Sequence, residues 1–195
     1  MRLILLASAL TVVGCGSGTG QIMVSMTDAP VSDPNVKNVF VTYDELRIHS
    51  DGTQNAPVGG PDAHADGVDG PGWIVLCSET RTVDLLALLN NVFTPVCTRT
   101  AADGGLEAAP ITVPAGRISQ LRLHVTSARL TFVDGSPDQT LTIPSGSTSG
   151  LKINVQRDVP SGGTLALKLD FDAGASLTKL GDGTWRMGPV LRVLP

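Results

Sequence analysis

The stretch 164–177, TLALKLDFDAGASL, constrains the fold more than any other part of the chain. Large apolar side chains recur at every second position from Leu165 to Phe171, with polar or small residues between them. This period of two is typical of a strand with one face buried and the other in water. Each of these apolar side chains contributes about 1.5–3 kcal/mol when fully buried, so the strand is predicted to anchor the core.

The same alternation recurs along the chain, with turns between the alternating segments. The predicted strands include 21–27, 36–50, 73–77, 117–132, 151–155 and 164–172. Aromatic residues make up 4% of the chain, whereas Gly (22) and Pro (13) are frequent, as expected for a β protein rich in turns. One short helix is predicted over 82–91, with Asp84 as its N-cap. Because strands and helices do not alternate, we predict an all-β fold, an antiparallel two-sheet β-sandwich of the immunoglobulin or prealbumin kind.

Two of the predicted strands lose their phase in the middle. The apolar residues step by three from Tyr43 to Leu46, and again from Val125 to Ala128. A slip of one residue turns every later side chain to the opposite face of a sheet. We therefore predict a β-bulge in each strand, which returns the later apolar residues to the core.

The N-terminal segment indicates an exported protein. An apolar run at 3–10, too short to span a bilayer, leads to Val12-Val13-Gly14-Cys15. These residues resemble a bacterial lipobox, which implies a signal peptide over 1–14, cleavage after Gly14, and acyl chains such as palmitate on Cys15. Several acyl chains give stable membrane anchoring where one alone is marginal. The alternative is an ordinary secretory signal with a chance cysteine. In the lipoprotein interpretation, residues 15–20 are a flexible tether, and residues 21–195 form a single domain.

Export also bears on the other two cysteines. With Cys15 lipidated, Cys77 and Cys97 form an even pair in an oxidising compartment, so we predict one disulfide. It contributes about 3 kcal/mol in the loop-entropy account. The alternative is two buried thiols. Gly16 is not Asp, which argues against retention at an inner membrane and favours the outer membrane or cell surface.

The longest predicted loop, 51–72, holds His64 and the acids Asp62, Asp66 and Asp69. Their spacing does not follow the alternating ligands of a calcium-binding EF-hand loop, and Ca²⁺ requires six to eight converging oxygens. We interpret this segment as a flexible, solvated insert, and predict no metal site in it.

Three further acids form the candidate site. Asp170 and Asp172 share the polar face of the core strand at its end, and Asp28 ends the first strand just before Pro30. If these strand ends meet at one rim of the sandwich, either backbone amides or a cation must satisfy the carboxylates. We favour amides that brace the loops, because three acids supply too few oxygens for Ca²⁺.

Four short motifs follow one another behind the lipobox. They are TDAP at 27–30, VDLL at 83–86, PSG at 144–146 with SGLK at 149–152, and DFDA at 170–173. In this order they resemble the prokaryotic lipoprotein family called domain of unknown function forty-three eighty-two, over residues 20–192. Arg117 stands where the family is expected to have an aromatic residue, and the 51–72 loop is expanded. The resemblance implies an architecture and a surface location but no activity.

The net charge and the histidines narrow the possible classes of function. A net charge of −4 without a basic cluster argues against nucleic-acid binding. The histidines His49, His64 and His124 do not lie in a nucleophile or metal-ligand motif, so we predict no enzyme activity and no cofactor. We expect a cell-envelope lipoprotein, membrane-bound through its lipid, whose loops bind a glycan or a protein. The alternatives are a hydrolase that uses the three aspartates of the candidate site, and a structural component of a surface assembly.

Overall fold

The computed structural model describes residues 18–51, 72–143 and 150–195. The lipobox at 12–15, most of the predicted insert (52–71) and the glycine- and serine-rich stretch 144–149 lie outside the described residues. Among the residues that the structure describes, no helix has both the length and the apolar character needed to cross a membrane.

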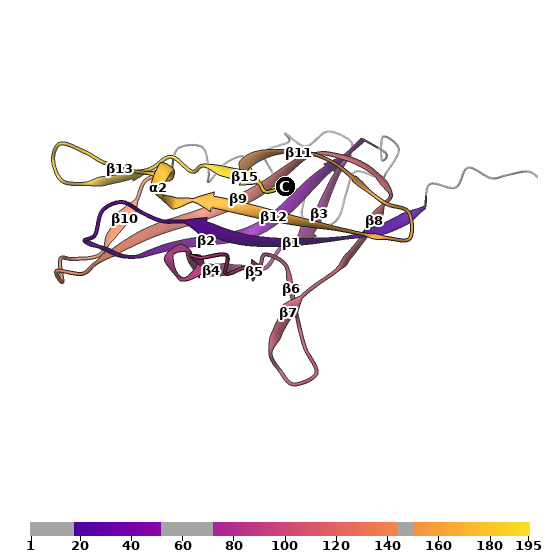
Figure 1. Ribbon diagram of the computed structural model, residues 1–195, viewed down its shortest axis with the longest axis horizontal. Helices are drawn as coiled ribbons and strands as arrows, with labels where there is room; N and C mark the ends of the chain where they lie inside the picture. The colour runs from indigo at the N-terminus through magenta and orange to yellow at the C-terminus, as the bar shows by residue number, and fades with distance from the viewer. Residues whose placement is uncertain (1–17, 52–71, 144–149) are drawn as a thin grey trace, which may run out of the picture.

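Two β-sheets pack face to face (Figure 1). Sheet A has the strand order β15-β12-β1-β5, and β8 also pairs with β1. Its strands are β1 (Thr19–Ala29), β5 (Thr94–Pro95), β8 (Ile111–Pro114), β12 (Thr164–Asp172) and β15 (Leu191–Val193). Sheet B has the order β10-β9-β2-β3, with β11 paired to β9 and β4 paired to β2. Its strands are β2 (Val36–Ser50), β3 (Trp73–Cys77), β4 (Arg81–Asp84), β9 (Gly116–Phe132), β10 (Gln139–Leu141) and β11 (Leu151–Val159).

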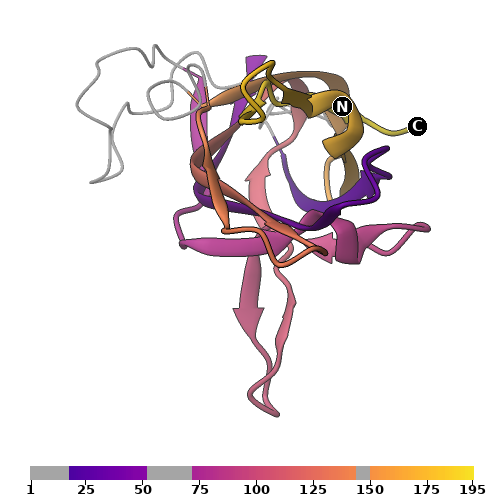
Figure 2. The same cartoon turned by 90° about the vertical axis from the view of Figure 1, so that its left-hand side faces the viewer.

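The core lies between these sheets, which surround it in the view along the long axis (Figure 2). The alternating residues predicted to be apolar anchors supply it from both sides. Its largest fully buried side chains are Tyr43, Phe171, Ile22, Met26, Leu46, Ile48, Leu85, Ile118, Leu121, Leu123, Leu130 and Leu169. The predicted all-β sandwich is therefore the observed architecture.

The two long strands, β2 and β9, form the spine of sheet B and carry the predicted bulges. Tyr43 pairs with Val125 and Glu45 with His124, so Asp44 is an extra residue on β2. On β9 the extra residue is Thr126, because Ser127 pairs with Thr42. The bulges return the later apolar residues to the core, as predicted, since Leu46 and Ile48 beyond them are fully buried.

One strand pair departs from the predicted antiparallel pattern. β1 and β12 run parallel, in register from Gln21 opposite Thr164 to Ala29 opposite Asp172. Parallel neighbours need a long crossover, and here almost the whole domain lies between the two strands along the chain. Alternation within each strand does not reveal the direction of its neighbour, which is why the sequence did not indicate this pairing.

The predicted helix over 82–91 is wrong in extent. Residues 81–84 instead form β4, which pairs with β2, and only η2 (Leu85–Leu88), a single 3₁₀ turn, is helical. Asp84 is its N-cap as predicted, and accepts a hydrogen bond from the Leu86 N–H at 3.2 Å. A short isolated helix is marginal, so pairing with β2 prevails over helix formation for the first three residues of the segment.

Two small hairpins and one helical turn complete the described fold. The hairpin of β13 (Leu177–Lys179) and β14 (Trp185–Met187) closes over the predicted Asp-Gly turn. The hairpin of β6 (Thr98–Thr100) and β7 (Leu106–Ala108) stands away from the body of the sandwich (Figures 1 and 2). The turn α2 (Ala173–Ser176) directly follows β12 and leads the chain into the first of these hairpins.

Candidate functional site

The parallel pairing of β1 with β12 brings two of the sequence motifs together. Thr27 lies opposite Asp170, Asp28 opposite Phe171, and Ala29 opposite Asp172. The TDAP and DFDA motifs, distant in the sequence, therefore end side by side at one edge of the core. We call the three aspartates and their partners the carboxylate junction.

Asp28 occupies a core position of β1. The strand buries every second residue from Ile22 through Met26, and Asp28 continues this phase with 6% of its surface exposed. Asp170 and Asp172 belong instead to the opposite phase of β12, which alternates with the fully buried Leu169 and Phe171. The three carboxylates thus gather at one end of the sheet but lie on both of its faces.

The Asp28 carboxylate is only half satisfied. Its Oδ1 accepts a hydrogen bond from the Ala173 N–H at 2.8 Å, whereas Oδ2 is buried without a hydrogen-bond partner. Burial raises the pKa of Asp28 to about 7, against the opposing effect of the N–H groups of Ala173 and Ala29. The negative charges of Asp170 and Asp172 add a smaller rise in this pKa.

Asp170 is paired with a residue that the sequence did not associate with it. Arg192, on β15, donates from Nε to Asp170 Oδ2 at 2.8 Å, and its Nη2 lies 2.5 Å from the same oxygen. The register supports this contact, because Asp170 and Arg192 are directly opposite in the β12–β15 pair. Asp170 is buried, so this charge-assisted contact compensates a carboxylate that has lost much of its water.

Asp172 organises the chain that leaves β12. Its Oδ1 accepts from the Ala175 N–H at 2.8 Å, which makes it the N-cap of α2. The Ser176 hydroxyl returns a hydrogen bond to the Asp172 carbonyl at 2.6 Å, and Arg192 Nη2 lies 3.8 Å from Asp172 Oδ2. Gly174 permits the close packing of this turn, since a Cβ there would lie 2.6 Å from the carbonyl oxygen of Pro30.

The chemistry of the carboxylate junction follows from these separate partners. Each acid meets a different donor, from the backbone or from Arg192, and the loops are held in place by those bonds. Within the described ranges no group of three or more His, Cys, Asp or Glu residues is placed to hold a metal ion. Arg192 is the member that alternation could not find, because only the β12–β15 register places it opposite Asp170.

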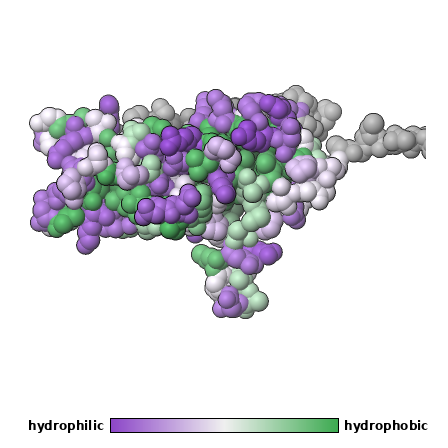
Figure 3. Space-filling view, in the orientation of Figure 1, coloured by the Kyte–Doolittle hydropathy of each residue, from purple (hydrophilic) through white to green (hydrophobic). Residues whose placement is uncertain are grey.

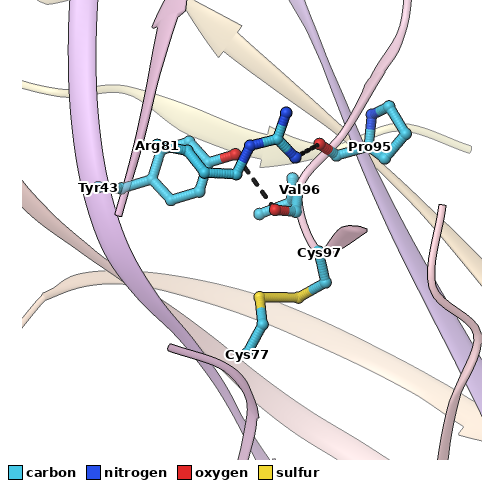
Figure 4. The surroundings of a disulfide bond; sticks show 6 residues. All are labelled: Tyr43, Cys77, Arg81, Pro95, Val96 and Cys97. Atoms are coloured by element: carbon cyan, nitrogen blue, oxygen red, sulfur yellow. Dashed lines mark hydrogen bonds between the residues drawn. A yellow bond between two sulfur atoms is a disulfide. The ribbon is translucent and has the colours of Figure 1, made fainter. Parts of the chain in front are cut away.

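A second group of contacts lies at the β5 edge of sheet A. The predicted disulfide between Cys77 and Cys97 is confirmed, with Cα atoms 5.7 Å apart (Figure 4). Next to it the Tyr43 hydroxyl donates to the Val96 carbonyl at 3.2 Å, and Arg81 Nη1 donates to the Pro95 carbonyl at 2.9 Å. We call these contacts the disulfide edge, because they tie strands of sheet B to the β5 segment of sheet A.

The β6–β7 hairpin begins one residue after Cys97. Opposite charges face each other across it, with Arg99 Nε donating to Glu107 Oε1 at 2.8 Å. Leu106, by contrast, exposes 66% of its surface, the largest fraction among the exposed large hydrophobic residues of the described chain. In the space-filling view the hairpin extends from the body and bears both hydrophobic and hydrophilic groups (Figure 3).

The structure also places a serine and an aspartate beside a histidine, which the sequence did not predict. His49 Nδ1 lies 2.9 Å from the Ser119 hydroxyl and 3.4 Å from Asp51 Oδ1. A Ser-His-Asp relay needs the hydroxyl on one ring nitrogen and the carboxylate on the other. Here both partners meet Nδ1, so this arrangement is not that of a catalytic triad. His124 is separately paired, with Nδ1 2.5 Å from Asp44 Oδ1 at the bulge.

Trp73 lies next to His49 on the outer side of sheet B. The guanidinium carbon of Arg122 is 3.9 Å from the centre of the Trp73 ring, and the His49 ring meets Trp73 edge-on at 5.2 Å. The register across β2 explains the grouping, because His49 is opposite Trp73 on β3 and Gln120 on β9. These residues lie on three different strands, so only the pairing of β2 with β3 and β9 brings them together.

The fold and these contacts define a two-sheet β-sandwich domain with one disulfide, braced at the ends of β1 and β12 by carboxylates. Over residues 19–189 the sequence matches the family described as "Domain of unknown function (DUF4382)", and the chain belongs to this family. The family resemblance inferred from the ordered motifs is thereby confirmed. No curated protein and no solved structure shows a significant match to the chain.

Proposed function

We propose that the chain is a lipid-anchored protein of the cell envelope. On this proposal its β-sandwich is a non-catalytic module that binds an extracellular or periplasmic ligand, a protein or a glycan, through its loops. The observation that carries the binding part is the β6–β7 hairpin, which projects from the sandwich with Leu106 in water.

The form of this hairpin supports a role in recognition. Binding residues are often carried on loops that a rigid scaffold positions. The disulfide edge supplies such a base, since Cys97 is covalently tied to β3 and its carbonyl accepts a hydrogen bond from the Ala109 N–H at 3.2 Å. An apolar side chain as exposed as Leu106 offers contact area that the fold itself does not use.

The anchor is supported by residues 12–15, which resemble a bacterial lipobox. Cys15 precedes Thr19, the first residue of β1, by a few residues only. A Cys15→Ala variant is expected to move from the detergent phase to the aqueous phase in a membrane partition assay. An unchanged distribution in that assay would contradict the lipid anchor.

The binding role is tested by site-specific photo-cross-linking on intact cells. A photoreactive residue placed at Leu106 is expected to give discrete cross-linked species, and the same residue placed at Val133 is expected to give none. Val133 is the matched control, because it is 65% exposed and directly follows β9, away from the hairpin. No cross-linked species at Leu106, or equal patterns at both positions, would contradict recognition through the hairpin.

A further inference from the structure

Asp28 has a property that the loop-bracing role of the carboxylate junction does not explain. A bracing carboxylate normally directs both oxygens to donors, as buried polar groups rarely lack partners. Asp28 directs Oδ1 to the Ala173 N–H at 2.8 Å, but Oδ2 is buried without a partner. It also stands in the core phase of β1, opposite Phe171, with 6% of its surface exposed.

The two protonation states of this carboxyl differ sharply in such a place. An ionised carboxylate with a bare oxygen loses its hydration without compensation, which is far more costly than burial of a neutral acid. A neutral carboxyl still offers the acceptor lone pairs that the Ala173 N–H requires. The geometry therefore favours the protonated acid in the folded domain and the ionised acid once this end of the sheet opens.

The surrounding charges also favour the protonated form of Asp28. Asp170 and Asp172 on β12 carry negative charges that oppose ionisation of Asp28, and Arg192 on β15 is already engaged with Asp170. Asp33, in the turn after β1, and Lys179, on β13, form an ion pair with each other at 3.5 Å. The other elements next to this part of β1 carry no titratable side chain: α2 is AGAS, η2 is LLAL and β5 is TP. No cation on these elements compensates an Asp28 carboxylate.

We propose that the Asp28 carboxyl is a proton-controlled latch, which when neutral holds the ends of β1 and β12 against α2 and when ionised releases them. This inference does not depend on the proposed function. The latch couples directly to α2 through the Ala173 N–H, and α2 in turn packs on the turn at Pro30. Opening would therefore free the Pro30 turn and the start of the β13–β14 hairpin together.

The direction of the pH dependence follows from proton linkage. Folding raises the pKa of Asp28 from its ordinary value of 3.8 to about 7 through burial. The folded domain then holds this proton more tightly than the unfolded chain, so its contribution to stability is complete below about pH 4 and is lost as the pH rises to about 7. This is opposite to the usual aspartate, which stabilises the folded state when ionised.

The test compares the wild type with Asp28→Asn, which keeps the acceptor for Ala173 but cannot ionise. Relative to the variant, the folded-to-unfolded ratio of the wild type is expected to fall at least about tenfold between about pH 5 and about pH 8 in urea titrations. The histidines are common to both proteins and cancel in this difference. Asp172→Asn removes one of the smaller contributions to the raised pKa of Asp28, so it is expected to keep most of the wild-type pH slope.

A direct measurement covers the case in which Asp28→Asn fails to fold. Carbon-13 NMR of the wild-type carboxyl groups is expected to show Asp28 titrating near neutral pH. Exchange of the Ala173 amide with solvent is expected to accelerate over the same range, beyond the ordinary effect of hydroxide on exposed amides. Titration of Asp28 near its ordinary value, or equal pH slopes in the wild type and Asp28→Asn, would overturn the proposal.

Discussion

The disulfide edge and the carboxylate junction solve the same structural problem by different chemistry. Both tie an end of sheet A to its surroundings, the first through Cys97 near β5 and the second through Asp28, Asp170 and Asp172 at the ends of β1 and β12. The disulfide edge depends on a covalent bond, and beside it the main-chain carbonyls of Val96 and Pro95 accept hydrogen bonds. The second depends on charges whose states vary with burial and with their neighbours.

The difference between the two regions shows which kind of contact can respond to pH. A disulfide in an oxidising compartment is insensitive to pH over the physiological range, and its main effect is to restrict the unfolded chain. A buried carboxylate gains or loses its contribution as it binds or releases a proton. The base of the projecting hairpin is thus held by the part of the molecule that is insensitive to pH, and the α2 end by the part that responds to it.

The largest effect is expected from removal of the covalent bond. The double variant Cys77→Ala with Cys97→Ala is predicted to lose about 3 kcal/mol of unfolding free energy in urea, because the unfolded chain regains the freedom of the closed loop. Amide exchange is expected to accelerate at Val96 and to remain unchanged at Ala173 under conditions where only local opening occurs. Equal acceleration at both amides would show that the two regions are not independent.

The next largest loss of stability is expected from replacement of Arg192 in the carboxylate junction. Arg192→Gln leaves Asp170 buried and without its cationic partner, which costs 3–5 kcal/mol in fully buried pairs. Because 58% of the Arg192 side chain is exposed, we expect a smaller loss of about 1–2 kcal/mol. Arg157→Gln, on an exposed position of β11, is the control and is expected to change stability little. A loss as small as that of the control would mean that water replaces the arginine.

A smaller effect is expected at the helix cap. Asp172→Ala removes the acceptor of the Ala175 N–H and is predicted to lower the unfolding free energy by about 1 kcal/mol. Asp172→Asn is expected to restore most of this loss, since asparagine caps helices as well as aspartate does. Failure of asparagine to rescue would indicate that the charge of Asp172, and not its capping bond, matters.

No effect is expected from calcium. Asp28 lies on the face opposite to Asp170 and Asp172, and each acid already has its own donor, so the junction does not present the converging oxygens that Ca²⁺ requires. The melting temperature of the wild type is predicted to be the same with and without Ca²⁺ at about millimolar concentration. A calcium-dependent rise that disappears in Asp170→Ala would contradict the separate roles of these acids.

Much of the fold was accessible from the sequence because its signals are local. The strands at 36–50, 73–77 and 164–172 were predicted with the bounds that the structure has, and the two phase slips indicated the bulges at Asp44 and Thr126. The prediction of a helix over 82–91 was wrong in extent for a non-local reason, since its first three residues pair with β2. A partner strand decided what the local pattern left ambiguous.

The candidate site shows the same division. The three aspartates were recognised from strand ends, and the sequence left open whether they meet at one rim. The structure gathers them at one end of sheet A, on both of its faces. The phase of β1 already assigned Asp28 to the apolar side together with Met26, a signal present in the sequence and missed. The partners Arg192 and Ser119 had no such signal, because each reaches its acid or histidine across a pair of strands.

The sequence by itself determined the alternation, the bulges, the turn residues, the cap at Asp84 and the two cysteines, since each depends on residues near one another in the chain or on residue type alone. Only the tertiary structure decided that β1 and β12 run parallel and that Asp28 lies opposite Phe171. Hydrogen bonding between strands is made by the backbone, which is the same for every residue, so the choice of neighbour comes from the packing of the whole core. The alternation of β1 turned Asp28 to the apolar side, but only the choice of β12 as neighbour placed its carboxyl group opposite Phe171 and beside the Ala173 N–H, where burial raises its pKa.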